Sequence, residues 1–143
     1  MAPCVFDCAS ARAAELVGFK AMMLSGAELS MSMNGLPDLD LLTLDELSWA
    51  VNRITSASVL PLAVDIQDGF GSSTLNVYHT CERMIKAGAD AVLLEDESEP
   101  GFARKVVEKN ILPRDEYIAK IKAAHAALEG SDCLLIARTN IAI

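Results

Sequence analysis

Short apolar runs alternate along this chain with longer segments in which apolar residues recur at helical spacing. The alternation is typical of parallel strands joined by right-handed crossovers. We predict strands at 3–6, 19–24, 61–65, 90–94 and 133–137, and helices at 10–18, 44–57, 74–87 and from Pro113 to just before Gly130. The pattern therefore predicts an α/β fold built on a parallel sheet.

Local signals place the ends of these helices. Ser10 is a plausible N-cap for the first helix, and Gly18 ends it. Thr43 and Glu46 have the spacing of a capping box, with Thr at the cap and Glu three residues later. Residues 28–42 show no clean period and are predicted to form a long loop over the sheet, and residues 96–112 also resemble a loop.

Three of the predicted strands end in polar side chains. Asp65-Ile66-Gln67-Asp68-Gly69 follows the third strand, Glu95-Asp96-Glu97 the fourth, and Arg138-Thr139-Asn140 the fifth. Because the carboxyl ends of parallel strands meet at one edge of a sheet, these groups are expected to share one site. No Gly-x-Gly-x-x-Gly follows the first strand, so a dinucleotide-binding sheet loses support and a (β/α)8 TIM barrel gains it.

The length of the chain limits how much of such a barrel it holds. A barrel needs eight units and typically about 250 residues. The chain has 143 residues. We therefore expect residues 1–143 to form a single incomplete barrel domain, truncated after about five β/α units.

Charge and composition exclude some partners. The chain has 12 basic and 20 acidic residues and a net charge of −8, which argues against a nucleic-acid surface. Its four cysteines form no C-x-x-C pair and are expected to be free, mostly buried thiols in a reducing compartment. No basic-then-apolar leader opens it, and no apolar run approaches a membrane span of roughly 18 residues. A cytoplasmic protein without a membrane partner is expected.

Six short segments stand in order along nearly the whole chain. They are VFDCASAR at 5–12, GFKA at 18–21 with SGA at 25–27, GLPD at 35–38 with Leu42, Thr43 and Glu46, DIQDGFG at 65–71, EDE at 95–97, and ARTN at 137–140. Each is weak alone, but six in this order and spacing form a specific signal. Together they resemble the isocitrate lyase/phosphoenolpyruvate mutase superfamily.

The resemblance implies a Mg²⁺-dependent enzyme, with Mn²⁺ as a possible substitute. Such enzymes form or break a C–C or P–C bond in small 2-oxo carboxylates or phosphonates through a metal-bound pyruvate enolate. By the same resemblance, Asp65 would be the direct metal ligand, and Glu95 and Gln67 would contact the ion through water. Mg²⁺ keeps several waters and needs few direct protein ligands. The partners expected are a small-molecule substrate and further copies of the chain in a homo-oligomer.

The resemblance also implies substrate-binding and catalytic residues. Arg138 would bind a carboxylate and help to stabilise the enolate oxygen. Backbone amides of Ser25, Gly26 and Ala27 would cradle the other end of the substrate as a small anion nest. Asp38 matches a family aspartate near the water shell of the metal.

Three departures from the family pattern narrow the expected reaction. Gln67 and Asn140 stand where the family has aspartates, so two negative charges are lost. The lyase branch carries a catalytic cysteine in a loop soon after the segment that corresponds to EDE at 95–97, but residues 98–105 of this chain contain neither Cys nor His. Mutase, hydrolase and decarboxylase-like chemistry therefore fits better than isocitrate or methylisocitrate cleavage.

Simpler interpretations remain open for several residues. Asp68 and Glu97 are expected in solvated loops, and His79 and His125 on helix surfaces. Arg138 either binds substrate or pairs with a carboxylate of the site. An alternative for the whole chain is a non-catalytic or inactive half-barrel that oligomerises through its strand edges.

Overall fold

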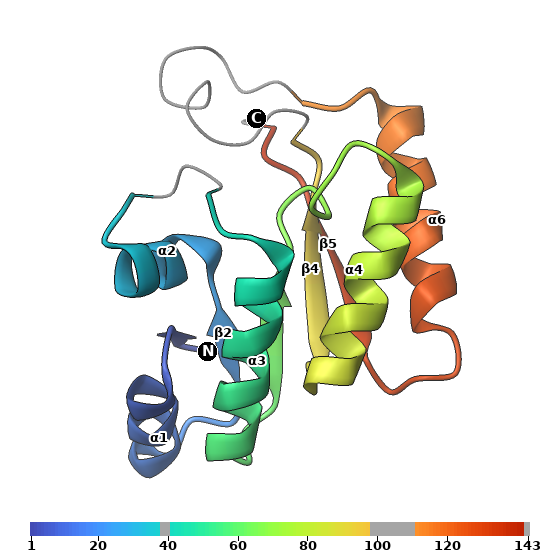
Figure 1. The fold of residues 1–143 in the computed structure, drawn as a ribbon. Helices are drawn as coiled ribbons and strands as arrows, with labels where there is room; N and C mark the ends of the chain where they lie inside the picture. The colour runs from blue at the N-terminus through green and yellow to red at the C-terminus, as the bar shows by residue number, and fades with distance from the viewer. Residues whose placement is uncertain (38–40, 98–110, 142–143) are drawn as a thin grey trace.

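All five strands lie parallel in one sheet in the order β1-β2-β3-β4-β5, so each strand pairs with its neighbours in sequence (Figure 1). The computed structural model describes residues 1–37, 41–97 and 111–141. The strands are β1 Cys4–Val5, β2 Met22–Leu24, β3 Leu62–Asp65, β4 Ala91–Glu95 and β5 Leu134–Arg138. The helices are α1 Cys8–Val17, α2 Gly26–Asn34, α3 Leu44–Ala57, α4 Thr74–Ala87 and α6 Arg114–Leu128. The predicted α/β fold with a parallel sheet is confirmed.

The sequence located the longer helices best. Helices α3 and α4 have the predicted bounds, and the Thr43–Glu46 capping box is present, with the Glu46 amide donating to Thr43 Oγ1 over 3.2 Å. The first helix differs: Asp7, not Ser10, is its N-cap. The Ser10 amide donates to Asp7 Oδ1 over 2.7 Å, so Ser10 is the third helical residue of a capping box that starts earlier than predicted.

The loop predicted over 28–42 is wrong in its first half, because α2 occupies Gly26–Asn34. Ser25 is the N-cap, and Gly35 ends the helix in a left-handed conformation with φ of 64°. Leu29 is buried, but Met31 and Met33 are exposed. Since apolar methionines lie on the solvent side, the helical period is hidden in the sequence.

The core lies between the sheet and the helices α1, α3, α4 and α6, which follow one another along one face of the sheet (Figure 1). Its members are at most 8 % exposed and come from strands and helices alike, including Met22, Leu24, Leu62, Val64, Val92, Leu94, Leu47, Val51, Ile54, Val77, Met84 and Leu128. This packing holds the strands in register and brings their carboxyl ends together.

Two further expectations can be compared with this fold. All four cysteines are free, but only Cys81 is buried, and Cys4 is exposed. The expectation of mostly buried thiols is therefore wrong. Among the helices in the described part of the chain, none is long and apolar enough to cross a membrane.

Candidate functional site

One cavity of about 210 Å³ lies at the carboxyl ends of β2, β3, β4 and β5. The residues that line it are Ser25, Gly26, Ala27, Asp65, Gln67, Glu95 and Arg138. These are the seven candidate residues that the sequence indicated within the described ranges. The eighth, Asp38, lies outside the described residues. Residues up to 113 positions apart in sequence thus meet because parallel strands end at one edge.

Glu95 is the centre of the polar contacts in this cavity. Its side chain is only 4 % exposed, and its Oε1 lies 2.8 Å from Nη1 of Arg138, whose side chain is 46 % exposed. The amide Nδ2 of Asn140 donates to Glu95 Oε2 over 2.7 Å. An aspartate at position 140 would place a second carboxylate against Glu95, so Asn140 replaces a repulsion with a hydrogen bond.

The turn after β3 presents Asp65 and Gln67 from the neighbouring strand. The backbone N–H of Gln67 donates to Asp65 Oδ1 over 2.9 Å, and the backbone carbonyl of Gln67 accepts from the backbone N–H of Glu95 over 2.7 Å. Gln67 has a φ of 51°, in the left-handed region that is uncommon for a non-glycine residue. This conformation ends the strand and holds the Gln67 side chain at the cavity.

The segment Ser25-Gly26-Ala27 enters the cavity as the start of α2. The first amides of a helix have no acceptor within the helix, and the helix dipole is positive at this end, so the segment suits an anion. The Ser25 hydroxyl donates to the carboxylate of Glu28, a contact that the sequence did not indicate. A Cβ on Gly26 would lie 3.1 Å from Nε2 of Gln67, so glycine permits the close approach of the two sides of the cavity.

The donors in the cavity fit a hard divalent cation that keeps most of its waters. Asp65 and Glu95 supply two buried carboxylates and Gln67 a side-chain amide, all oxygen ligands of the kind that Mg²⁺ and Mn²⁺ prefer. Within the described ranges, no group of three or more His, Cys, Asp or Glu residues has the geometry of a metal site. The arrangement therefore suits few direct protein ligands, not a closed cage.

The end of β5 is anchored by two residues that sequence reasoning missed. Asp96 is 4 % exposed. It accepts from the Thr139 hydroxyl over 2.5 Å and from the backbone N–H of Asn140 over 2.9 Å. The Tyr117 hydroxyl of α6 donates to the Leu94 carbonyl over 2.7 Å and accepts from the Arg138 amide over 3.1 Å. Burial raises the pKa of Tyr117 to about 12. These contacts fix the backbone that carries Arg138 and Asn140.

Two residues expected in solvated loops are buried. Asp68 is 7 % exposed and pairs with Lys120 of α6, and Glu97 is 4 % exposed, with its backbone bridged to Ile111. Both expectations are wrong, because both side chains are packed inside the protein and do not face solvent. His79 and His125 are exposed on helices, as expected.

The negative charges of Glu28 and Asp65 affect the thiol of Cys4 in β1. Its thiol pKa is raised, first by partial burial and then by the negative charges of Glu28 and Asp65. Because β2 separates β1 from β3 in the sheet, the sequence does not predict that Cys4 lies near Asp65.

A larger cavity, of about 420 Å³, lies against α1, α2 and α3. Its lining is mainly apolar and includes Phe6, Leu29, Met33 and Trp49. Besides its size, a binding site needs a few convergent polar groups, and the smaller cavity has two carboxylates, a side-chain amide and a guanidinium in its lining. The smaller, polar cavity is therefore the candidate site.

Comparison with known proteins identifies the family. The sequence pattern of the family described as phosphoenolpyruvate phosphomutase matches residues 1–143. The chain belongs to this family. The resemblance seen in the six sequence segments is therefore confirmed for the phosphoenolpyruvate phosphomutase family as a whole.

Curated relatives of this phosphoenolpyruvate phosphomutase family member carry different activities. The chain is 39% identical over 138 residues to an oxaloacetate decarboxylase of Paraburkholderia xenovorans, covering 96% of this chain and 46% of that protein. It is 39% identical over 127 residues to a 2-methylisocitrate lyase of Escherichia coli, covering 89% of this chain and 43% of that protein. The chain thus spans less than half the length of either relative.

A solved structure confirms the fold of this family member. The structure of an oxaloacetate acetylhydrolase in complex with the product oxalate matches with a TM-score of 0.88 and 34% identity. The match covers 97% of this chain and 47% of that one. The five strands and five helices described above therefore correspond to about half of a TIM barrel of the phosphoenolpyruvate mutase/isocitrate lyase superfamily.

Proposed function

We propose that this chain carries the metal- and substrate-binding half of a Mg²⁺- or Mn²⁺-dependent enzyme. Its reaction would form or break a C–C or P–C bond in a small 2-oxo carboxylate or phosphonate. Members of the superfamily catalyse reactions of this general kind on oxo acids and phosphonates. The observation that carries the proposal is the meeting of seven candidate residues around one polar cavity.

The residues of the chain have separable tasks in this proposal. Asp65 would hold the cation directly, and Glu95 and Gln67 would hold its water shell. When bound, the ion would supply a Lewis acid beside a carbonyl oxygen of the substrate. Arg138 is half exposed and already oriented by Glu95. Its remaining N–H groups would bind and align a substrate carboxylate.

The start of α2 would hold the opposite end of the same substrate. Gly26 and Ala27 line the same cavity as Arg138, and their backbone amides need no side-chain charge to bind an anion. The Ser25 hydroxyl already donates its hydrogen bond to Glu28, so the backbone amides and not this hydroxyl would bind the substrate anion. Asp38 stays a proposed catalytic residue on the basis of the family motif alone.

The proposed reaction lies in the mutase, hydrolase and decarboxylase-like group. Residues 98–105 carry neither the cysteine nor a histidine of the lyase loop. The similarity to a 2-methylisocitrate lyase shows common ancestry, but the general acid–base group of that branch has no counterpart in this segment. A cytoplasmic homo-oligomer is proposed as the working form.

Metal and ligand titration tests this function. Calorimetry with Mn²⁺, then with oxalate as a mimic of an enolate, should show binding by the wild-type chain. Asp65→Ala should abolish Mn²⁺ binding, whereas Asp132→Ala, an exposed position just before β5, should leave it unchanged. If the wild type binds neither Mn²⁺ nor oxalate, the enzyme proposal fails for this chain.

A second candidate, the self-associating half-barrel, has one observation in its favour. Leu134 and Ile136 of β5 are 68% and 41% exposed, so the described sheet leaves apolar side chains uncovered at one edge. Native mass spectrometry during the same titration separates the two. Oligomers that bind no metal support the half-barrel, and metal binding that depends on Asp65 contradicts it.

A further inference from the structure

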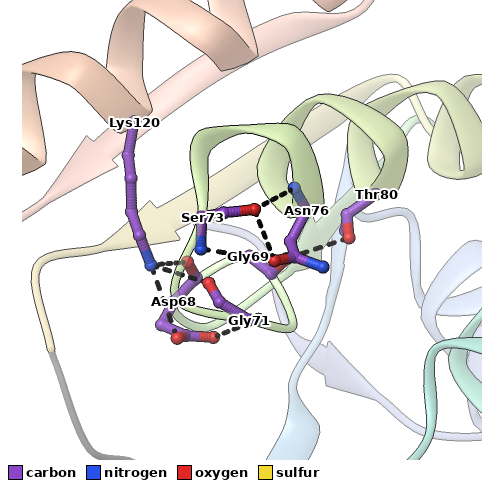
Figure 2. A network of polar contacts seen from close by, with 7 residues as sticks. All are labelled: Asp68, Gly69, Gly71, Ser73, Asn76, Thr80 and Lys120. Carbon is purple, nitrogen blue, oxygen red and sulfur yellow. Dashed lines mark hydrogen bonds and ion pairs between the residues drawn. The ribbon is translucent and has the colours of Figure 1, made fainter.

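Lys120 is a buried cation that contacts the loop after β3. It is 3 % exposed, and its side chain extends from α6 to the loop after β3 (Figure 2). Its Nζ donates to the Asp68 carbonyl over 2.7 Å and to the Gly71 carbonyl over 3.0 Å, and lies 3.4 Å from Asp68 Oδ2. A lysine is rarely buried unless its charge is compensated, and here three oxygen atoms compensate it.

The loop that Lys120 contacts has an uncommon backbone. Gln67 and Phe70 have φ of 51° and 59°, and Gly69 and Gly71 have φ of 95° and 151°. Non-glycine residues seldom adopt such values, so surrounding contacts must hold the loop in this shape. Besides Lys120, the Thr80 hydroxyl donates to the Gly69 carbonyl over 3.0 Å (Figure 2).

The same loop has two functional sides. Gln67 lines the candidate cavity together with Asp65, the last residue of β3, whereas Asp68 and Gly71 contact Lys120. Gln67 and Asp68 are adjacent in the chain, so a change in the backbone at Asp68 moves the residue that lines the cavity. Lys120 is therefore connected to the candidate metal ligand Gln67 through one peptide unit.

We propose that Lys120 is a positioning residue whose ammonium group acts as an internal cation for loop 66–71 and sets the metal affinity of the cavity. The proposal rests on the proposed function, since it assumes a cation at Asp65. The role needs the charge and not only the volume of the side chain, because two carbonyls and a carboxylate converge on Nζ. A methionine of similar length would fill the space and leave these acceptors unsatisfied.

The test compares Lys120→Met with Lys122→Met, an exposed lysine two residues further along the same helix. Loss of an outer-shell partner typically weakens metal affinity by about 10- to 100-fold. We expect Lys120→Met to bind Mn²⁺ about tenfold more weakly and to exchange the amide hydrogens of residues 66–71 faster. Lys122→Met should match the wild type in both.

Chemical rescue separates charge from packing. Lys120→Ala should regain slow exchange in loop 66–71 with n-propylammonium chloride, but not with n-propanol, which has the same length without the charge. If Lys120→Ala does not fold without an added compound, recovery of folding by n-propylammonium and not by n-propanol also shows that the charge is required. Equal recovery with the alcohol overturns the proposal.

Failure of the function and failure of this inference give different results. If the wild type binds no Mn²⁺, the proposed function fails, and loop exchange with rescue then decides whether Lys120 positions the loop. If the wild type binds Mn²⁺ and folded Lys120→Met binds it equally well, Lys120 is only structural and the inference is overturned.

Discussion

The Arg138 guanidinium and the Glu95 carboxylate lie 2.8 Å apart at the ends of the adjacent strands β5 and β4. The two residues are direct partners in the strand register. The ion pair is asymmetric in its burial, since the side chain of Glu95 is 4 % exposed and that of Arg138 is 46 % exposed. Glu95 therefore depends on the pair more than Arg138 does.

Arg138→Gln tests that dependence. It removes the Arg138 guanidinium from a carboxylate that is almost fully buried, so the free energy of unfolding should fall by about 1–3 kcal/mol, less than for a fully buried pair. Urea unfolding measures the loss. Arg12→Gln, at an exposed pair with Glu15, should cost much less, because solvent screens that pair. Equal losses for the two variants would show that burial of Glu95 does not set the cost.

Gln67→Asp should strengthen metal binding and weaken the metal-free fold. An aspartate tolerates the left-handed backbone at this position and adds a negative charge beside Asp65 and Glu95. We expect Mn²⁺ affinity to rise by about tenfold, since the number of charged ligands tunes such sites. Calorimetry checks the affinity and thermal unfolding the stability. Asn52→Asp, which adds the same charge at an exposed position on α3, should change neither.

Gly69→Ala should be more costly than Gly130→Ala, although both glycines have positive φ, of 95° and 81°. A Cβ at position 69 would lie 2.5 Å from Cγ2 of Val77, whereas one at position 130 meets nothing within 4 Å. We expect a loss of about 1 kcal/mol from backbone strain at Gly130 and about 1–3 kcal/mol more at Gly69 from overpacking. Equal losses in chemical denaturation would mean that the Val77 contact relaxes freely.

Stability should fall as the pH rises above 9. Burial raises the pKa of the Cys81 thiol to about 12 and that of Cys133 to about 11, from a usual value of 9.0. Because the folded pKa values are raised, their contribution is complete below pH 9 and is lost as the pH rises toward 11 and 12. The buried Cys81 adds a slope of up to about 1.4 kcal/mol per pH unit, and the partly exposed Cys133 adds less because solvent screens it.

Urea midpoints between pH 8 and 10, with a thiol reductant present, measure this slope. Cys81→Ala should make the slope shallower. The variant lacks a thiol that loses its proton at a lower pH in the unfolded state than in the folded state. A slope unchanged by Cys81→Ala would show that this thiol does not contribute to the alkaline loss.

Sequence reasoning located the site well where a strand ends in a polar cluster. Asp65, Glu95 and Arg138 follow apolar runs, so their placement at one edge follows from parallel pairing alone. It failed for Lys120 and Asp68. Each looks like an ordinary solvent-exposed residue, and only the packing of α6 against the loop after β3 makes them partners.

The sequence by itself determined the α/β architecture, the helices α3 and α4, the family, and the residues that line the cavity. These depend on local periodicity, capping and strand order, which are properties of neighbouring residues. The tertiary structure decided which contacts those residues make: Arg138 with Glu95, Asn140 in place of a repelling acid, and Lys120 beneath the Gln67 turn. Such contacts join positions 43 to 52 residues apart, and their geometry exists only once the sheet has packed against its helices.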